Sequence, residues 1–100
     1  MNEQELRTKI ASRLRAGMLP SEPPAKTFAG IGEGTICDCC GVAITDRDVQ
    51  YEVDFATSAG SSLRTIVAHR ECHRIWHGLV ETAASRRRAS RDSRPVSTGI

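Results

Sequence analysis

The sequence predicts a small α+β domain that is held together by a cluster of side chains more than by a large core. Three patterns lead to this fold class. Two short cysteine-containing motifs flank the middle of the chain, residues 49–55 alternate between apolar and polar, and residues 70–84 carry apolar side chains at helical spacing. One hundred residues allow one domain at most. A core of that size buries little apolar surface, so metal ligands or disulfides are expected to stabilise it.

The chain divides into four expected segments. They are an N-terminal amphipathic helix (1–18), a Pro/Gly linker (19–35), a metal-stapled domain (36–84) and a disordered basic tail (85–100). The tail holds five arginines against one aspartate, for a charge of +4, whereas the rest of the chain carries −2. No apolar run approaches the roughly 20 residues of a membrane-spanning helix, and no signal-peptide pattern is visible. We therefore expect a cytoplasmic protein with reduced thiols.

The N-terminal segment is typical of an amphipathic helix over residues 3–16. Leu6, Ile10 and Leu14 recur at every fourth position and therefore share one face. Asn2 suits the N-cap. We expect the apolar face to dock on the metal-stapled domain or on a second copy of the chain, which would give a homodimer. A basic helix for nucleic acid or a membrane surface is the alternative, and the glutamates of this segment weaken it.

Residues 19–35 are expected to form a linker, because their three prolines interrupt helices and sheet ladders. Phe28 and Ile31 are the large apolar residues of its second half, and we expect them to hold the linker against the core. The segment also contains a Gly-x-Gly-x-Gly run. No strand precedes it and no Lys-Ser/Thr follows it, so a phosphate-binding loop is not indicated.

The middle of the chain predicts an antiparallel hairpin followed by a helix. Residues 49–55 and 63–68 form its strands, and the turn-rich residues 57–62 join them. We expect the first strand to bury its odd-numbered side chains, which are Val49, Tyr51, Val53 and Phe55. The helix is expected from about residue 70 to residue 84, with an apolar stripe made of Ile75, Trp76, Leu79, Val80 and Ala83.

Two pairs of side chains predict a metal site. Cys37 and Cys40 form a Cys-x-x-Cys pair, His69 and Cys72 form a His-x-x-Cys pair, and 28 residues separate the two pairs. A hairpin of that length can return the second pair to the first. Three thiolates and one imidazole are ligands of a tetrahedral structural Zn²⁺ site. In a reduced compartment this pattern favours zinc over disulfides, and over a coincidence of cysteines.

The residues beside these pairs have secondary roles. Gly41 tolerates the positive φ of a tight turn, and we expect its N–H and that of Val42 to donate to the sulfurs. Cys39 is a spare thiol that could substitute as a ligand, although a small packing residue is the simpler interpretation. His73 and His77 lie one helical turn apart and could bind metal as a pair. Such histidines more often face solvent or pack, so we leave them outside the predicted site.

The order of knuckle, hairpin and ligand-bearing helix resembles the treble-clef class of zinc fingers. The ligand set Cys37-x-x-Cys40…His69-x-x-Cys72 is also similar to the first zinc site of LIM domains, and small bacterial proteins with a single finger look similar as well. The chain departs from the LIM pattern because its loop is longer and no second ligand set follows. The resemblance covers about residues 36–80. It implies a metal-stapled interaction module. Treble clefs serve protein, DNA and RNA partners alike, so the fold alone does not name the partner.

We expect this chain to be an interaction or regulatory module, with protein as its leading partner class, and not an enzyme. His69-x-Glu71 resembles the His-x-Glu of zinc deaminases, but the Cys-x-x-Cys pair precedes the histidine here, and Cys72 fills the fourth position. A thiol-redox protein that uses Cys37 and Cys40 is the alternative enzyme, and the βαβ context of thioredoxin-like proteins is missing. The open edge of the hairpin and the N-terminal helix are the expected protein-binding surfaces.

A nucleic-acid-binding finger is the second alternative. Its contacts would come from arginines of the second helix and the tail, namely Arg70, Arg74, Arg86, Arg87, Arg88 and Arg91. Phosphate contacts would then dominate, and binding would weaken steeply with salt. The chain has only four aromatic residues, so a stacking surface for single strands is not indicated.

Overall fold

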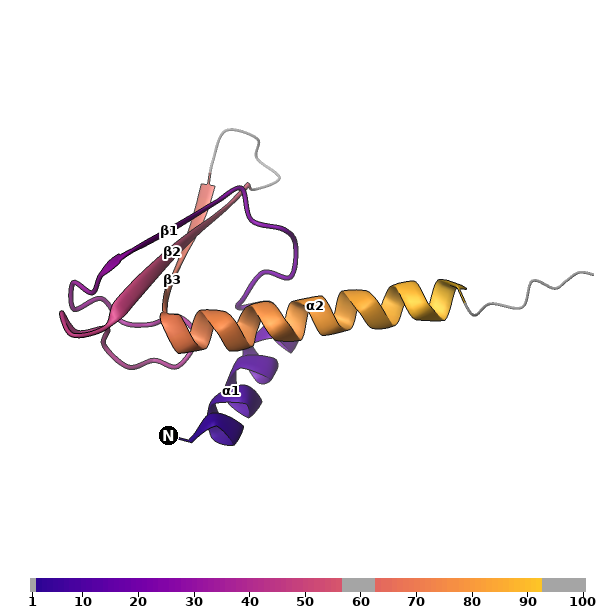
Figure 1. Cartoon of the computed structure of the whole chain (residues 1–100), viewed down its shortest axis with the longest axis horizontal. Helices are drawn as coiled ribbons and strands as arrows, with labels where there is room; N and C mark the ends of the chain where they lie inside the picture. The colour runs from indigo at the N-terminus through magenta and orange to yellow at the C-terminus, as the bar shows by residue number, and fades with distance from the viewer. Residues whose placement is uncertain (1, 57–62, 93–100) are drawn as a thin grey trace, which may run out of the picture.

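The computed structural model describes residues 2–56 and 63–92. These residues form two helices and a three-stranded antiparallel sheet, which confirms the α+β fold class (Figure 1). In chain order the elements are α1 (Glu3–Arg15), β1 (Lys26–Ile31), β2 (Val49–Ala56), β3 (Leu63–His69) and α2 (Arg70–Asp92). No helix in the described residues is long and apolar enough to cross a membrane.

Helix α1 has the ends that its sequence predicts. The Asn2 side chain accepts a hydrogen bond from the backbone N–H of Glu5 at 2.8 Å, which satisfies one of the free donors of the first turn. Gly17 follows the C-cap with a φ of +76°, a conformation that a residue without a side chain adopts readily. Ile10 is fully buried, with Leu6 and Leu14 packed beside it, so the apolar face of α1 docks on the chain's own core.

Strands β2 and β3 form the predicted hairpin, with Val53 opposite Ile66 and Gln50 opposite His69. The expected turn at residues 57–62 lies outside the described residues. Val53 and Phe55 are buried as the alternation predicts. The first residues of the strand differ, because Val49 is exposed and Gln50 is buried. The amide of Gln50 contacts Glu33, whose backbone N–H donates to it at 3.3 Å, and this explains how a polar side chain can be buried there.

Strand β1 corrects the sequence-based prediction of a linker. Its residues pair with β2 in antiparallel register, from Lys26 opposite Asp54 to Ile31 opposite Val49. The prolines that suggested a linker all precede the strand, so they do not interrupt its ladder. Phe28 and Ile31 do not hold the segment against the core, because they are 56% and 73% exposed.

Helix α2 is longer than predicted. It continues through residues 85–92, which the sequence analysis assigned to a disordered tail, and its last turns extend beyond the rest of the described fold (Figure 1). Alanine and arginine are good helix formers, so this stretch can continue a helix whose first turns are already fixed. Residues 93–100 of the expected tail lie outside the described residues.

The core lies between the sheet, the first half of α2 and α1. The indole N–H of Trp76 donates to the carbonyl of Pro20 at 2.9 Å, and the Trp76 ring packs on Phe55 with ring centroids 5.6 Å apart. The carbonyl of Met18 accepts a hydrogen bond from Arg64 at 2.6 Å. These contacts hold the chain after α1 against the sheet and α2, so the N-terminal third belongs to the same packed unit as the cysteine motifs.

Candidate metal centre

The first predicted ligand pair, Cys37 and Cys40, lies on a tight turn. An isolated β-bridge between Ile36 and Ala43 closes this turn. The backbone N–H of Cys37 donates to the carbonyl of Val42 at 2.9 Å, and the N–H of Gly41 donates to the carbonyl of Cys37 at 2.9 Å. Gly41 has a φ of +80°, as its position predicted. This turn directs the side chains of Cys37 and Cys40 to the same side.

The other two predicted ligands come from the junction between β3 and α2. His69 is the last residue of β3, and Cys72 lies in the first turn of α2. Together the four side chains form one cluster, because their ligand atoms all lie within 4.8 Å of one another. Three of the four residues are buried and His69 is half-buried. The hairpin therefore returns the chain to the first pair, as the spacing predicted.

The distances in the cluster are compatible with zinc. Zinc bonds to sulfur at about 2.3 Å and to imidazole nitrogen at about 2.0–2.1 Å, so tetrahedral ligand atoms lie about 3.5–3.8 Å apart. The Nδ1 atom of His69 is 3.5 Å from the Cys40 sulfur and 3.9 Å from the Cys72 sulfur. Cys37, Cys40, His69 and Cys72 are thus close enough to bind a metal ion, and their donor set is one that zinc prefers.

Asp38 fastens the cysteine turn to the sheet. Its backbone N–H donates to the carbonyl of Val67 at 2.8 Å, and its carboxylate accepts from the N–H of Val67 at 2.8 Å. These two bonds occupy the side of β3 that faces away from β2, two residues before His69. They therefore fix the first ligand pair relative to the second independently of any ion.

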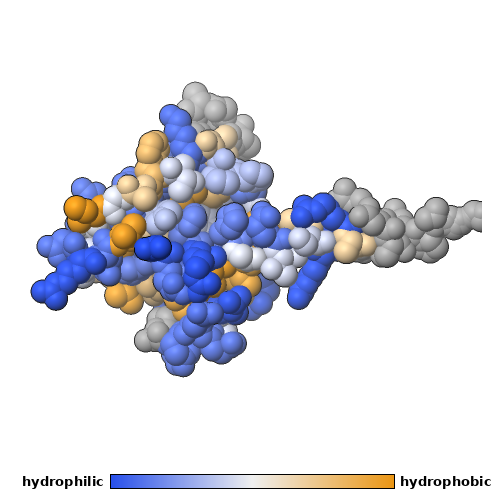
Figure 2. Space-filling view, viewed as in Figure 1, coloured by the Kyte–Doolittle hydropathy of each residue, from blue (hydrophilic) through white to orange (hydrophobic). Residues whose placement is uncertain are grey.

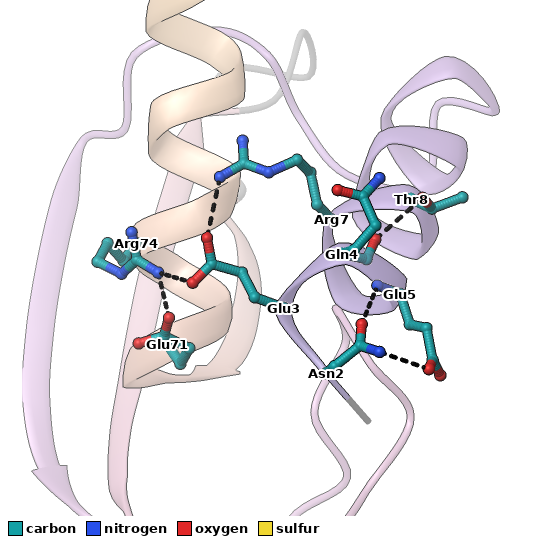
Figure 3. Close-up of polar contacts among 8 residues, drawn as sticks. All are labelled: Asn2, Glu3, Gln4, Glu5, Arg7, Thr8, Glu71 and Arg74. Atoms are coloured by element: carbon teal, nitrogen blue, oxygen red, sulfur yellow. Dashed lines mark hydrogen bonds and ion pairs between the residues drawn. The ribbon is translucent and has the colours of Figure 1, made fainter.

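Helix α1 covers the same turn from another direction. Lys9 donates to the carbonyl of Cys40 at 3.0 Å, and Arg13 donates to the carbonyl of Asp38 at 2.6 Å. At its other end, α1 is joined to α2 through Glu3, which accepts from Arg74 at 3.1 Å (Figure 3). Lys9 and Arg13 thus satisfy backbone carbonyls of the cysteine turn, a role that the sequence analysis did not assign.

The pKa values of the three thiols in the cluster shift in different directions. Hydrogen bonds from Cys39 and Cys72 hold the pKa of Cys37 well below its ordinary value. The contact with Cys37 raises the pKa of Cys72, and burial raises that of Cys40. Because a coordinating thiol is deprotonated, these two thiols would release their protons to solvent on binding a metal.

Backbone N–H groups near the sulfurs differ in part from the prediction. The N–H of Cys39 donates to the Cys37 sulfur at 3.3 Å, and the N–H of Val42 acts to lower the pKa of Cys40. The N–H of Gly41 does not reach a sulfur, because it closes the turn onto the carbonyl of Cys37. Donors of this kind stabilise thiolate ligands by spreading their negative charge.

Cys39 lies beside the cluster but is not one of its four converging ligands. Its side chain is fully buried. The hydrogen bond to Cys37, with burial, raises the pKa of Cys39, which therefore stays a protonated thiol. This arrangement fits a packing residue that also donates to a ligand sulfur.

The sequence analysis missed Asp48. A carboxylate oxygen of Asp48 lies 3.8 Å from Nε2 of His69, on the opposite side of the ring from the sulfurs. The same oxygen accepts from the backbone N–H and the hydroxyl of Thr45, each at 3.0 Å, which fixes its position. A carboxylate on the far side of a metal-binding imidazole orients the ring and favours the tautomer with Nδ1 free for the metal. Only the tertiary fold brings the loop of Asp48 to this ring.

His73 and His77 lie on α2 away from the four ligands. The ring of His73 stacks on Tyr51 with centroids 4.5 Å apart and meets Trp76 edge-on at 6.1 Å. Burial, followed by the neighbouring His77, lowers the pKa of His73, so this ring is neutral near pH 7. His73 thus packs against the sheet, in line with leaving both histidines outside the predicted site.

The six predicted nucleic-acid-binding arginines are not brought into one patch. Arg74 pairs with Glu3 and Glu71, as Figure 3 shows. Arg70 begins α2, whereas Arg86, Arg87 and Arg88 are exposed near its other end, about 24–27 Å away at 1.5 Å per residue. Arg91 lies in the last turns of the same helix.

Comparison with protein-family models, with curated protein sequences and with solved structures finds no match to this chain. The site is therefore characterised by its own geometry and chemistry.

Proposed function

We propose that Cys37, Cys40, His69 and Cys72 bind a structural Zn²⁺ ion, and that the chain is an interaction module and not a catalyst. The convergence of these four side chains carries this proposal. Four protein ligands complete a tetrahedral zinc site, whereas catalytic sites keep one position open for water or substrate. The three thiolates require a reducing compartment, which favours the cytoplasm.

The environment of Glu71 supports the absence of catalysis. Glu71 occupies the position of the proton-shuttling glutamate of zinc deaminases, but its carboxylate pairs with Arg74. This contact lowers the pKa of Glu71, so the carboxylate stays ionised and engaged. A general acid–base residue needs the opposite, a pKa near the working pH and a free path to the reacting group.

The two surfaces that the sequence analysis offered for a protein partner, the N-terminal helix and the hairpin edge, are both occupied, because β1 and the cysteine turn cover the two edges of the hairpin. The apolar face of α1 is already occupied, because Ile10 is buried in the chain's own core. The edge of the sheet at β1 is open, and all six residues of this strand are exposed. Exposed sheet edges bind extended segments through backbone hydrogen bonds, so we propose β1 as the protein-binding surface.

Nucleic acid is a second candidate, and the length of α2 favours it. Arg86, Arg87 and Arg88 are exposed on the part of α2 that extends beyond the body. Such a helix can approach phosphates closely. Arg74 is removed from this candidate surface because two glutamates already neutralise it.

Native mass spectrometry tests the zinc proposal. We expect one zinc per folded chain, released on denaturation to leave all four thiols free. Cys39→Ser is the matched control: it changes a buried thiol next to the ligands and should keep one zinc, whereas Cys40→Ser should lose it. A metal-free chain lighter by thiol hydrogens would contradict the proposal and favour the redox alternative with Cys37 and Cys40.

Retention on immobilised duplex DNA and on single-stranded RNA at increasing salt tests the second candidate. Phosphate binding predicts retention at low salt that falls steeply as salt rises. Replacing Arg86, Arg87 and Arg88 with glutamine should abolish it, while Arg74→Gln should change it little. Absence of retention at low salt would exclude this candidate.

A further inference from the structure

The two edge strands of the sheet, β1 and β3, differ in whether other parts of the chain cover them. At β3, the backbone N–H and C=O of Val67 are hydrogen-bonded to Asp38, so the cysteine turn covers that edge. At β1, each of the six residues is exposed, and nothing comparable covers the strand within residues 2–56 and 63–92. Proteins usually protect a free edge with charges, prolines or bulges. Here Lys26 is the only charged residue of β1, and residues 27–31 are uncharged.

The outward-facing backbone groups of β1 can be identified from its pairing with β2. The N–H of Gly32 donates to the carbonyl of Asp48 at 3.0 Å, and these two residues continue the β1–β2 register. Because hydrogen-bonding groups alternate along an antiparallel strand, the even-numbered residues of β1 bond to β2. The N–H and C=O groups of Thr27, Ala29 and Ile31 therefore point to the open edge.

Apolar side chains accompany this edge. Phe28, Ile31 and Val49 are exposed, and Ile31 lies directly opposite Val49 in the β1–β2 ladder. Figure 2 shows apolar surface at the end of the molecule that carries the strands, on the side away from the projecting end of α2. Phe28 lies on one face of the sheet and Ile31 and Val49 on the other, so exposed apolar side chains flank the unpaired backbone groups on both faces.

We propose that the occupant of this edge is a second copy of the chain, joined by antiparallel pairing of the two β1 strands with Ala29 at the centre. The inference rests on the proposed function as an interaction module and names its partner. A two-fold axis perpendicular to a sheet keeps its faces aligned, so opposite residues must be both odd or both even. Centring on Ala29 meets this condition and directs the free groups of Thr27, Ala29 and Ile31 at those of the partner.

The side chains also fit this register. Phe28 lies opposite the partner's Gly30, and nothing lies within 4 Å of the place where a side chain on Gly30 would begin, so the ring has open space there. Aromatic residues across from glycine stabilise strand pairs. Ile31 lies opposite the partner's Thr27, and Lys26 opposite the partner's Gly32, so no like charges meet. The result is a continuous six-stranded sheet across two copies.

The interface is small, so the dimer should dissociate on dilution. Sedimentation velocity of the zinc-loaded protein over a wide concentration range is the test, with Ala29→Pro and Ala29→Ser as a matched pair. Proline removes an outward N–H that the monomer does not use, and edge strands tolerate it there. Serine keeps the N–H. We expect the wild type and Ala29→Ser to shift from monomer to dimer as concentration rises, and Ala29→Pro to stay monomeric with one zinc bound.

Hydrogen exchange of the wild type provides a second measurement that needs no variant. The amides of Thr27, Ala29 and Ile31 should become more protected as concentration rises, whereas those of α1 should not change. A zinc-loaded wild type that stays monomeric at every concentration would overturn the proposal while leaving the zinc module intact. A dimer without added protection at these three amides, or one that survives Ala29→Pro, would overturn it too. Loss of zinc in the wild type would instead refute the proposed function.

Discussion

The two halves of α2 are stabilised in different ways although they form one continuous helix. The half at residues 70–80 buries Cys72, Ile75 and Trp76. The half at residues 81–92 buries none of the side chains that the structure describes. Tertiary contacts and the ligand cluster hold the first half, whereas the second depends on helix propensity and on its attachment to the first. A single helix can therefore combine a structural anchor with an exposed arm.

The largest expected effect comes from removing a candidate metal ligand from the first half of α2. Structural zinc contributes about 10–16 kcal/mol in small fingers, which is comparable to the roughly 5–15 kcal/mol stability of a whole domain. Cys72→Ser should therefore unfold the chain and remove hydrogen-exchange protection from the amides of β2 and β3. A Cys72→Ser chain that kept this protection would show that packing alone holds the first half of α2.

Trp76→Ala tests the packing part of the anchor. The substitution removes a buried ring and its hydrogen bond to Pro20, and we expect a loss of about 3–5 kcal/mol in the free energy of unfolding. Urea denaturation of the zinc-loaded protein, followed by circular dichroism, measures it. Thr82→Ala, on an exposed position of the second half, is the control and should change the stability by less than about 0.5 kcal/mol.

Gly78 lies where the two halves meet. A side chain added there would meet no atom outside its own helix within 4 Å, so nothing in the fold requires glycine. Gly78→Ala should raise the free energy of unfolding by up to about 1 kcal/mol, because alanine favours the helix. Hydrogen exchange of residues 81–92 should slow in parallel. Unchanged exchange there would mean that the two halves are not coupled through this position.

The smallest effect is expected in the second half itself. Replacing Arg86, Arg87 and Arg88 with glutamine should leave the free energy of unfolding within about 0.5 kcal/mol of the wild type, because these side chains are exposed. Differential scanning calorimetry of the zinc-loaded protein measures it. A larger loss would show that the arm contributes to the folded body.

The cluster of four candidate metal ligands was predictable because its signal is chemical and local. Cysteine and histidine at ligand spacing, a glycine after the second cysteine and an alternating strand each indicate one structure, and they agree with one another. The same consistency predicted the hairpin of β2 and β3 and the start of α2. The convergence of Cys37, Cys40, His69 and Cys72 follows from these pieces together.

The remaining features depend on contacts that the sequence does not display. Strand β1 carries no buried residue, so it lacks the apolar alternation by which a strand is usually identified, and only its pairing with β2 defines it. Gln50 is buried because Glu33 reaches it across the sheet. Asp48 reaches His69 from a loop 21 positions earlier. The far end of α2 was missed because its serines and arginines are also common in disordered segments.

The position of Trp76 makes its intrinsic fluorescence a reporter of folding. Trp76 is the single tryptophan of the chain, one helical turn after Cys72, with its ring buried and its N–H bonded to Pro20. Its emission should lie at short wavelength in the closed fold and shift to longer wavelength when water reaches the indole. A chelator titration could therefore be followed without a label, with one intrinsic fluorophore reporting whether the ligand cluster and the packing around it come apart together.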